Sequence, residues 1–383
     1  MSAAPATPAD ATAASDIAAA IREAPFVRVV AAANGDSLAA SGVLARACRE
    51  SSIPFQVRID PVPAPAPGEG DDLVVGVGAA GGDIALPSAE VASLVAAAVA
   101  RELGVAPDPM LALAGVASAG RSPDVGDAAS LLDAARERTT VERRPGVATP
   151  TAELADGVAH SMLVHAPVSG DSEAATAALS TLGIPSPPGD EGRRRLASWL
   201  AIKATTSSAR AAEAVERALR PHATPEASFA TIEGFGDALD AVARERPGTG
   251  VALAIRDDDS LRTAVLDAWR DHARATHGAV TAAATGRYDG VLVARVDAGD
   301  PGRLGTVARL YRDYRSPEPV VIAVGNDAAA AASVDDARLD DAMREAARSV
   351  DGDGSSAGGA RRAAARVDGL EVSRFITAFR EAL

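Results

Sequence analysis

The stretch FVRVVAAANGDSLAASGVLARAC, residues 26–48, decides the fold of this chain. It begins with a short valine-rich run, Phe26 to Ala32, which ends at an Asn-Gly turn signal and therefore predicts a buried strand. After the turn, apolar residues recur at roughly helical spacing as far as Cys48. Small residues between them allow this helix to approach the sheet closely. A polar turn between a parallel strand and a helix is the usual ligand position in an open α/β sheet.

The turn itself, Asn34-Gly35-Asp36, allows two interpretations. Asp36 stands where the N-cap of a helix is expected, and acidic residues often fill that position without any further function. The same place at the carboxyl end of a strand makes Asp36 and Asn34 candidate active-site residues. Features elsewhere in the sequence are needed to distinguish these two interpretations.

Strands and helices alternate through the first half of the chain. The segment Pro61 to Asp72 is too rich in Pro and Gly to be either element and predicts a surface loop. Such alternation predicts an α/β fold whose first domain is a doubly wound, mainly parallel sheet with helices on both faces. The expected elements are strands at Phe55 to Asp60 and Leu73 to Gly78, and helices at Ser88 to Leu103, Met110 to Ala119 and Ala128 to Arg136.

The middle of the chain is less regular, and the alternation resumes after Gly250, which predicts a second, smaller α/β domain. The expected elements there are strands at Val251 to Ile255, Gly290 to Val296 and Val320 to Val324, and helices at Ser260 to Ala275, Arg303 to Tyr314, Leu339 to Val350 and Val372 to Leu383. The expected domain organisation is a disordered tail over residues 1–20, a first domain over 21–137, a helical or irregular connecting region over 138–235 and a second domain over 236–383.

Composition limits the class of protein. Acidic residues outnumber basic ones 52 to 38, and Lys203 is the single lysine, which is typical of a high-GC genome and a salt-rich cytoplasm. A net charge of -14 disfavours generic binding of nucleic acid over the whole surface, so such a contact would follow a local arginine track. No strongly apolar run approaches ~20 residues, which predicts a soluble protein with no membrane partner. Cys48 is the only cysteine, which excludes a disulfide within the chain and fits a cytoplasmic protein.

A glycine-rich segment, Gly76 to Gly81, matches the dinucleotide fingerprint GxGxxG. A phosphate-binding glycine loop has to open directly into a helix, and here Pro87 intervenes before the expected helix. No second strand ends in an acidic residue at the expected distance. This context favours a plain glycine turn over a cofactor site.

The histidines give one further candidate site. His160 and His165 follow Asp156 and form a group able to bind a metal or to hold a proton at neutral pH. A spacing of five residues matches neither the metal-binding pair of a strand nor that of a helix, which favours structural histidines. His272 and His277 are expected at the surface of a solvated helix.

Two arginine-containing segments near the C-terminus are candidate phosphate sites. In GSSAGGARRAAA, residues 354–365, a glycine pair precedes two arginines, so backbone N–H groups and guanidinium forks are available to a phosphate. The alternative is an exposed flexible loop. The segment Tyr311 to Arg315 places aromatic and arginine side chains on adjacent helical faces, as in a nucleic-acid track. Its alternative is a helix end that packs its tyrosines under the turn at Pro317.

The order of these parts resembles the DHH phosphoesterase superfamily with its DHH-associated C-terminal domain. The resemblance rests on the polar turn after the first strand, the helices ASLVAAAVARELG and MLALAGVASAG, and a C-terminal domain that ends in a Gly-Gly segment and AAARV. It is closest to archaeal RecJ-like proteins, and the acidic, lysine-poor composition suggests a haloarchaeal member. The resemblance implies a two-domain protein with a Mn²⁺ or Mg²⁺ site that cleaves phosphodiesters, in RecJ from the 5′ end of single-stranded DNA. Relatives that have lost the site act as replisome scaffolds with GINS and the replicative helicase.

The family motifs are degenerate in this sequence. The first motif, His-x-Asp-x-Asp, falls on Ala32 to Asp36, so Asp36 is its one remaining ionised ligand and Asn34 replaces another. The second-motif aspartate falls on Gly76, and the Asp-His-His signature falls on Asp83-Ile84-Ala85, which lacks both histidines. The Gly-Gly-His segment of the C-terminal domain becomes Gly358-Gly359-Ala360.

The resemblance therefore implies a RecJ-like protein of DNA replication or repair that has lost catalysis and serves as a replisome or single-stranded-DNA-associated factor. Two close divalent cations need several carboxylate and imidazole ligands, which one aspartate and one asparagine do not supply. The alternative is an active Mn-dependent 5′–3′ exonuclease or phosphoesterase with a rearranged site, and a third possibility is a structural partner without nucleic-acid contact. Candidate metal ligands are Asp36, Asp83, Asp156 and His160, and candidate phosphate or nucleic-acid contacts are Gly358, Gly359, Arg361, Arg362, Arg312 and Arg315.

Overall fold

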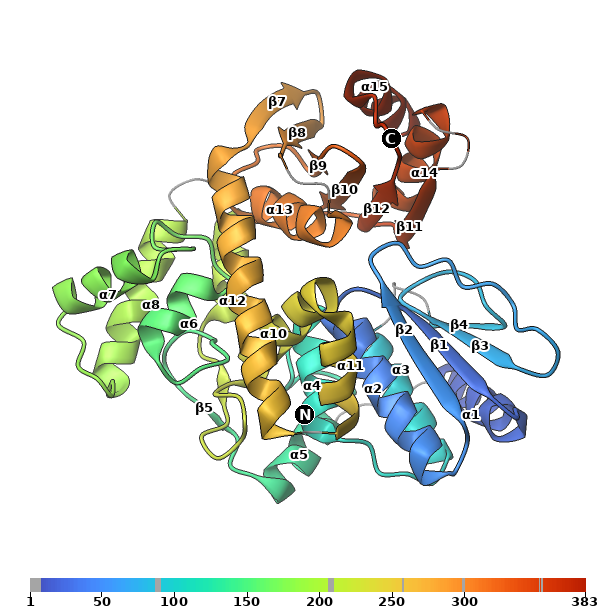
Figure 1. Cartoon of the computed structure of the whole chain (residues 1–383). Coiled ribbons are helices and arrows are strands. Elements are labelled where there is room, and N and C mark those ends of the chain that lie inside the picture. The colour runs from blue at the N-terminus through green and yellow to red at the C-terminus, as the bar shows by residue number, and fades with distance from the viewer. Residues whose placement is uncertain are drawn as a thin grey trace. The chain divides into compact units, whose positions relative to one another are not determined.

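The computed structural model describes residues 8–86, 91–205, 210–256, 258–297, 300–350, 352 and 354–383. The chain folds as two compact units (Figure 1). Unit 1 contains Met1–Glu142 and Ala223–Ala268, and unit 2 contains Arg143–His222 and Trp269–Leu383. Each unit thus combines two separate stretches of the chain, and this division does not follow the expected continuous domains 21–137, 138–235 and 236–383.

Helix α1, Pro8–Glu23, occupies most of the expected disordered tail. Ala14, Ala18 and Ile21 are buried at a spacing of four and three residues, so they form one apolar stripe of the helix. This stripe gives residues 14–21 a place in the packed core, in a region where a disordered tail was expected. Residues 1–7 lie outside the described part of the chain.

The core of unit 1 is a four-stranded parallel sheet in the order β2-β1-β3-β4. Its strands are β1 Val27–Ala32, β2 Phe55–Asp60, β3 Leu73–Val77 and β4 Ile84–Leu86. The parallel sheet predicted from residues 26–78 is thereby confirmed. In β1, Val27, Val29 and Ala31 are buried in alternation, as the two-residue period of a strand requires.

Helix α2, Gly35–Glu50, packs against this sheet and is surrounded by other helices of unit 1. Those helices are α3 Ala92–Glu102, α4 Pro109–Ser118, α10 Ile232–Glu245 and α11 Pro247–Arg256, with α5 Ala128–Arg138 beside α4. The strand expected at Val251 to Ile255 was wrong, because this apolar run belongs to α11 and packs on α2. A Cβ added to Gly42 would lie 2.5 Å from the Cβ of Ala254, so the two helices approach closely there. Ser88, the expected start of α3, lies outside the described residues.

Unit 2 contains a six-stranded sheet in the order β11-β12-β10-β9-β8-β7, in which only β8 and β9 are parallel. Its strands are β7 Ala284–Tyr288, β8 Val291–Arg295, β9 Val320–Val324, β10 Ala328–Ser333, β11 Ser355–Gly359 and β12 Arg362–Arg366. Helix α13, Pro301–Tyr314, packs on one face, and α14, Leu339–Val350, and α15, Val372–Ala382, contribute to the core on the other. Alternate residues of β9 and β10 enter two separate cores, so both faces of the sheet are buried.

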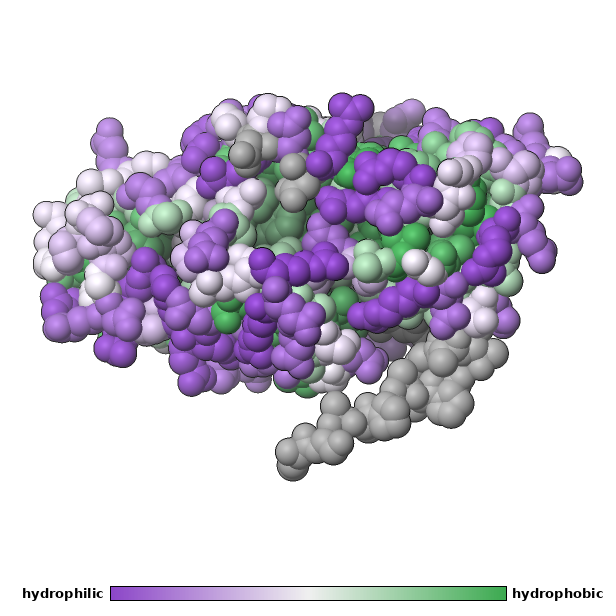
Figure 2. Space-filling model, turned by 90° about the horizontal axis from the view of Figure 1, so that it is seen from below, coloured by the Kyte–Doolittle hydropathy of each residue, from purple (hydrophilic) through white to green (hydrophobic). Residues whose placement is uncertain are grey.

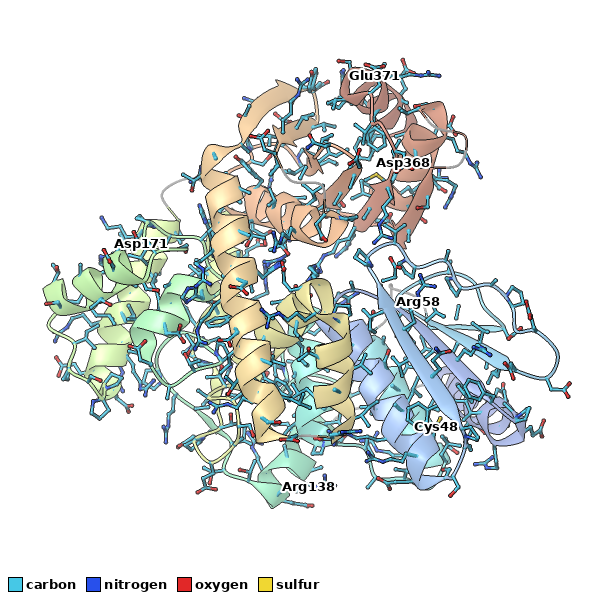
Figure 3. All side chains as sticks on the ribbon, in the orientation of Figure 1. Cys48, Arg58, Arg138, Asp171, Asp368 and Glu371 are labelled. Atoms are coloured by element: carbon cyan, nitrogen blue, oxygen red, sulfur yellow. The ribbon has the colours of Figure 1, made fainter. Side chains whose placement is uncertain are left out.

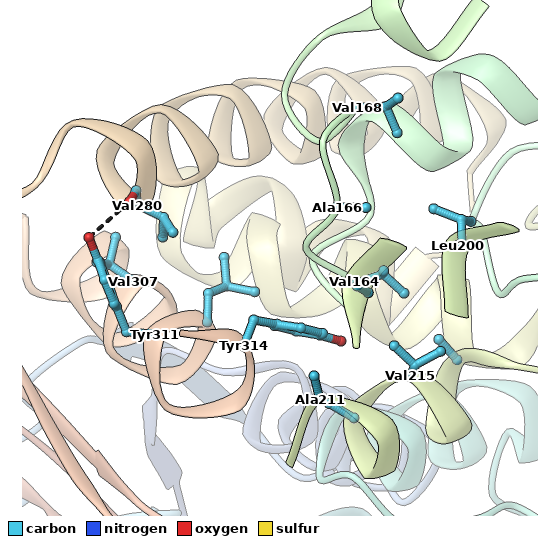
Figure 4. Close-up of a cluster of buried hydrophobic side chains, with 14 of the residues drawn as sticks. Val164, Ala166, Val168, Leu200, Ala211, Val215, Val280, Val307, Tyr311 and Tyr314 are labelled. Atoms are coloured by element: carbon cyan, nitrogen blue, oxygen red, sulfur yellow. Dashed lines mark hydrogen bonds between the residues drawn. The ribbon is translucent and has the colours of Figure 1, made fainter. Parts of the chain in front are cut away.

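The connecting region of the chain is helical and shares a core with the second sheet (Figure 4). Val164, Leu200 and Val215 from this region pack in the same cluster as Tyr311 and Tyr314 of α13. Its helices are α6 Leu154–His160, α7 Ser172–Thr181, α8 Asp190–Ala204 and α9 Arg210–Ala218. The chain also contains the short strands β5 Glu142–Arg143 and β6 His222–Ala223 and the long helix α12 Asp259–Ala282.

Hydrophilic residues cover much of the molecular face seen in Figure 2, with small apolar areas between them. None of the helices in the described ranges combines the length and the hydropathy that crossing a bilayer requires.

Candidate functional site

The turn after β1 places its three residues, Asn34, Gly35 and Asp36, in three different structural roles. Asn34, in an extended conformation, caps α2, because its Oδ1 accepts a hydrogen bond from the Ser37 backbone N–H at 2.9 Å. The cap of this helix is therefore Asn34, and the expectation that Asp36 caps it was wrong.

Asp36 instead caps a different helix, α3. Its Oδ2 accepts a hydrogen bond from the Ala92 N–H at 2.8 Å, and its Oδ1 accepts one from the Ser93 N–H at 3.0 Å. Val91, the residue at the N-cap position of α3, makes no capping hydrogen bond through its side chain. Asp36 is only 8% exposed, and burial raises the pKa of its carboxyl to about 6. Both oxygens of this buried carboxyl thus serve the first turn of α3.

The N-terminus of α2 has an anionic partner within unit 1. The Gly35 N–H donates to Asp240 Oδ1 of α10 at 3.0 Å, and Asp240 also forms an ion pair with Arg244. A Cβ on Gly35 would lie 2.8 Å from the Ser118 Cβ and 2.9 Å from the Asp240 backbone nitrogen, so only glycine fits between these helices. A helix N-terminus after a parallel strand is a common anion site. Here a carboxylate of the chain itself approaches it, and sequence reasoning missed Asp240 because α10 was not predicted.

Asp83 holds a loop together next to the sheet. Its Oδ2 accepts hydrogen bonds from the backbone N–H groups of Val74 at 2.8 Å and Gly68 at 3.1 Å, and these bonds lower the pKa of the carboxyl. The preceding glycine turn, Gly76 to Gly81, leads into strand β4. The helix that a dinucleotide-binding loop requires does not follow this turn directly, which agrees with the interpretation as a plain glycine turn.

Asp156 and His160 lie on α6 in unit 2 and form a partly buried hydrogen-bonded group with Arg270. Arg270 binds Asp156 through two hydrogen bonds, Nε to Oδ1 at 2.8 Å and Nη2 to Oδ2 at 2.9 Å. The Nδ1 atom of His160 lies 3.1 Å from Asp156 Oδ1, and its ring meets Trp269 edge-on. Burial by itself raises the pKa of Asp156, but the hydrogen bonds from His160 and Arg270 outweigh it and hold this pKa well below its usual range.

Within neither unit are the predicted metal ligands grouped as a divalent-metal centre among the described residues. Asp36 and Asp83 belong to unit 1, whereas Asp156 and His160 belong to unit 2. Within the ranges that the structure describes, no group of three or more His, Cys, Asp or Glu side chains is arranged to hold a metal ion. Mn²⁺ and Mg²⁺ require several oxygen ligands, and the carboxylates concerned already accept hydrogen bonds from backbone N–H groups or from Arg270. This donor set does not fit the two-metal site that the resemblance implies.

The histidines of α12 are buried, so the expectation that they lie at the surface was wrong. The rings of His165 and His277 stack with their Nδ1 atoms 3.0 Å apart, and His272 Nε2 lies 2.9 Å from Thr306 Oγ1. Burial lowers the pKa of His165 to about 4 and that of His277 to about 3, with Arg315 and His165 respectively adding to the effect. Helix α12 extends to Ala282, beyond the expected end at Ala275, and its C-terminal half packs inside unit 2.

The aromatic side chains of the predicted nucleic-acid track are core residues. Tyr311 donates a hydrogen bond to the Val280 carbonyl at 2.8 Å (Figure 4), and Tyr314 donates one to the Leu163 carbonyl at 2.6 Å. Arg312 is mostly buried, with its Nε 2.7 Å from Asp313 Oδ1 and its Nη1 3.1 Å from the Ser333 carbonyl oxygen.

Arg315, in contrast, is exposed. The alternative interpretation of Tyr311 to Arg315, a helix end that packs its tyrosines, describes this segment.

The glycine-arginine segment near the C-terminus is a β-hairpin, so the alternative interpretation as a flexible loop was wrong. Gly358 and Gly359 end strand β11, Arg361 lies in the turn, and Arg362 begins β12. Gly358 has a φ of 149°, and a Cβ there would collide with the backbone of β12. The hairpin explains the glycine without a ligand, and a phosphate role for the two arginines stays a prediction.

Two sequence comparisons identify close relatives. Residues 283–381 match the family model described as "Uncharacterized protein rrnAC1427, C-terminal domain". The chain is 45% identical over 388 residues to the protein of that description from Haloarcula marismortui, and the alignment covers 100% of both chains. The source organism of this relative, Haloarcula marismortui, agrees with the haloarchaeal character predicted from composition.

Solved structures of CDC45 and RecJ proteins have a similar fold. CDC45 from Entamoeba histolytica matches with a TM-score of 0.58 at 10% identity, covering 97% of this chain and 99% of its own. RecJ in complex with Mn²⁺ from Thermus thermophilus matches with a TM-score of 0.51 at 16% identity, covering 99% of this chain but 55% of its own. The chain thus spans about half the length of that RecJ protein.

These likenesses show a shared fold. The parallel sheet of unit 1 and the second sheet of unit 2 correspond to the mixed α/β architecture expected of a RecJ-like DHH protein. The chain therefore shares its fold with RecJ and CDC45 and belongs to the family of the Haloarcula marismortui protein rrnAC1427.

Proposed function

We propose that this protein acts in DNA replication or repair as a non-catalytic RecJ-like factor. The observation that carries the proposal is the role of Asp36. It is the one ionised residue left at the position of the family's first metal-binding motif, and both of its carboxylate oxygens cap helix α3.

The geometry makes a second role for Asp36 costly. If this carboxylate turned toward a cation, the N–H groups of Ala92 and Ser93 would lose their acceptors in a buried position. Each unsatisfied buried group costs about 1–3 kcal/mol. Retention of the aspartate is thus explained by helix capping, without any metal chemistry.

The fold supports the choice of cellular process. One structural neighbour is named CDC45 and the other RecJ, so the proposal places this chain in the processes that those proteins serve. Replisome proteins such as GINS and single-stranded DNA are the proposed partners.

A nuclease assay tests the loss of catalysis. The purified chain is incubated with 5′-labelled single-stranded DNA and Mn²⁺ in concentrated KCl, beside the variants Asp36→Ala and Asp171→Ala. Asp171 caps α7 through the same kind of hydrogen bonds but is exposed at the start of that helix (Figure 3), so it controls for the loss of a cap. We expect no Mn-dependent degradation by any of the three proteins. Degradation that disappears in Asp36→Ala and persists in Asp171→Ala would instead establish an exonuclease with a rearranged site.

A binding experiment tests the scaffold role. Purified GINS from the same organism is mixed with the chain in concentrated KCl and passed over a size-exclusion column. Co-elution of the two proteins is the expected result, and separate elution across the accessible range of salt and protein concentration would refute the GINS partnership.

A further inference from the structure

Four arginines from three separate segments lie together in unit 2. The segments 143–148 and 218–222 run side by side, joined by backbone hydrogen bonds from Arg144 N to Pro221 O at 3.1 Å and from Arg220 N to Gly146 O at 3.1 Å. Arg143 Nη1 donates a further hydrogen bond to the Arg220 carbonyl at 2.6 Å. We call the residues Arg143, Arg144, Arg193 and Arg220 the arginine cluster.

Arg193 joins this cluster from helix α8. A Cβ on Gly146 would lie 3.3 Å from Arg193 Cβ, 3.7 Å from its Cγ and 3.8 Å from its Cδ. The aliphatic part of Arg193 therefore lies along the glycine backbone. Gly146 has a φ of 129°, a conformation that favours glycine. Because glycine has no side chain, the Arg193 stem can lie against its backbone.

Arg220 is placed by an unusual backbone conformation. It is one of the non-glycine residues with positive φ, at 52°, and its side chain is exposed. Residues other than Gly, Asn and Asp seldom adopt this conformation. The paired segments hold it through the hydrogen bonds to its N–H and its carbonyl, which fixes the position from which the guanidinium extends.

The cluster concentrates positive charge on an acidic protein. The charge of Arg144 lies close enough to Arg193 to add to the effect of burial in lowering the pKa of Arg193, while Asp190 acts in the opposite direction. Arg143 and Arg144 take part in additional interactions. The inference therefore rests on the summed positive charge of the cluster and on the exposed guanidinium of Arg220, and it does not require Arg143 or Arg144 to lack a partner. In a chain of net charge -14, these four arginines are a local accumulation of positive charge.

We propose that the arginine cluster binds the phosphate groups of a single-stranded nucleic acid, an inference that rests on the proposed function in DNA replication or repair. Guanidinium groups match phosphate oxygens through paired hydrogen bonds, which a lysine ammonium does not. An acidic protein partner is less suited, because protein interfaces are built around apolar anchors. None of the large exposed apolar side chains of the described residues lies next to one of these four arginines along the chain. The nearest along the chain, Ile202, is nine residues, or about 13 Å of helix, from Arg193.

Binding of a fluorescent oligo-dT strand across a KCl series, with EDTA present, tests this site. The variant Arg193→Gln/Arg220→Gln removes two charges and keeps both side-chain stems, and the matched control Arg348→Gln/Arg374→Gln removes two exposed arginines of α14 and α15 in the same unit. Each phosphate contact contributes about 0.7 to the slope of log K against log salt for single strands, so the test variant should lose about 1.4 and the control nothing. Thermal unfolding of both variants verifies that they fold.

Two outcomes would overturn the proposal. One is an equal change of slope in the two double variants, which would mean that only overall charge matters. The other is competition by polyglutamate as effective as that by unlabelled oligo-dT, which would assign the site to an acidic peptide. Because EDTA is present and no cleavage is measured, a negative result leaves the proposed loss of nuclease activity untouched.

Discussion

Replacement of Asp36 by asparagine should change the pH dependence of stability more than stability at neutral pH. In the folded protein the pKa of Asp36 is about 6, against 3.8 for an unperturbed aspartate. The difference, at about 1.4 kcal/mol for each pH unit, corresponds to about 3 kcal/mol. The folded state binds more protons than the unfolded state between these two values. The contribution of Asp36 to stability is therefore fully present below pH ~4 and lost as the pH rises through ~6.

Asparagine at this position is neutral at every pH and offers one acceptor to two backbone donors. It removes the cost of about 3 kcal/mol for the buried charge at pH 8, but leaves the N–H of Ala92 or Ser93 unsatisfied at a cost of about 1–3 kcal/mol. The two terms nearly cancel at pH 8. At pH 4.5 protonation of Asp36 in the folded state has removed about 2 of these 3 kcal/mol, so the variant should be less stable relative to the wild type than at pH 8 by about 2 kcal/mol.

Guanidinium unfolding at pH 4.5, 6 and 8, at one fixed KCl concentration, measures this difference. The variant Asp171→Asn is the control, because Asp171 accepts the N–H groups of Glu173 and Ala174 at 2.9 Å each but is solvated. Its destabilisation should stay constant over this pH range. Parallel pH profiles for wild type and Asp36→Asn would refute the reasoning, as would a rise in melting temperature on Mn²⁺ addition that occurs in the wild type alone.

Other substitutions test further parts of the structure. His165 and His277 have lowered pKa values, so the wild type should lose stability from this pair as the pH falls from ~6.5 toward ~4, and His277→Gln should flatten this loss in the same unfolding assay. Gly35→Ala should destabilise by about 3 kcal/mol or more through collision with neighbouring helices. By contrast, Gly305→Ala, at a site with open space around the added methyl, should stabilise α13 by about 0.5–1 kcal/mol. Tyr314→Phe should cost about 1 kcal/mol by chemical denaturation and leave the affinity for oligo-dT unchanged, since the ring is buried. An equal loss for both glycine variants, or weaker DNA binding by Tyr314→Phe, would contradict the packing described.

The parallel sheet was predictable because its signals are local. A valine-rich strand, an Asn-Gly turn and a helix of small residues stand next to each other in residues 26–48, and the structure places them as expected. Even the role of Asp36 was half predictable. A helix cap was expected, but the helix that it caps begins 56 residues later, and this depends on tertiary packing.

Other elements escaped prediction because local preference and tertiary context disagree. Strand β10 is a run of alanines, which favours a helix in isolation, yet it pairs with β9 and β12 and is buried throughout. The apolar run in α11 fits a short strand equally well, and only its contact with α2 decides for a helix. The C-terminal hairpin turns at Ala360-Arg361, which carries none of the usual turn residues.

The hydrogen bond between Gly35 and Asp240 spans 205 residues of sequence, and this distance bears on how the protein is made. Unit 1 needs residues 223–268 to cover α2. The intervening residues 143–222 belong to unit 2, which cannot complete its structure until residues 269–383 have been made. Neither unit can be completed early as the chain leaves the ribosome. Long-range closure of this kind slows folding, because the entropy of a large loop is lost before its contacts form. A chain cut after residue 142 should accordingly fail to fold, because unit 1 lacks part of its structure until residue 268 has been made, and unit 2 until the stretch 269–383 has been made.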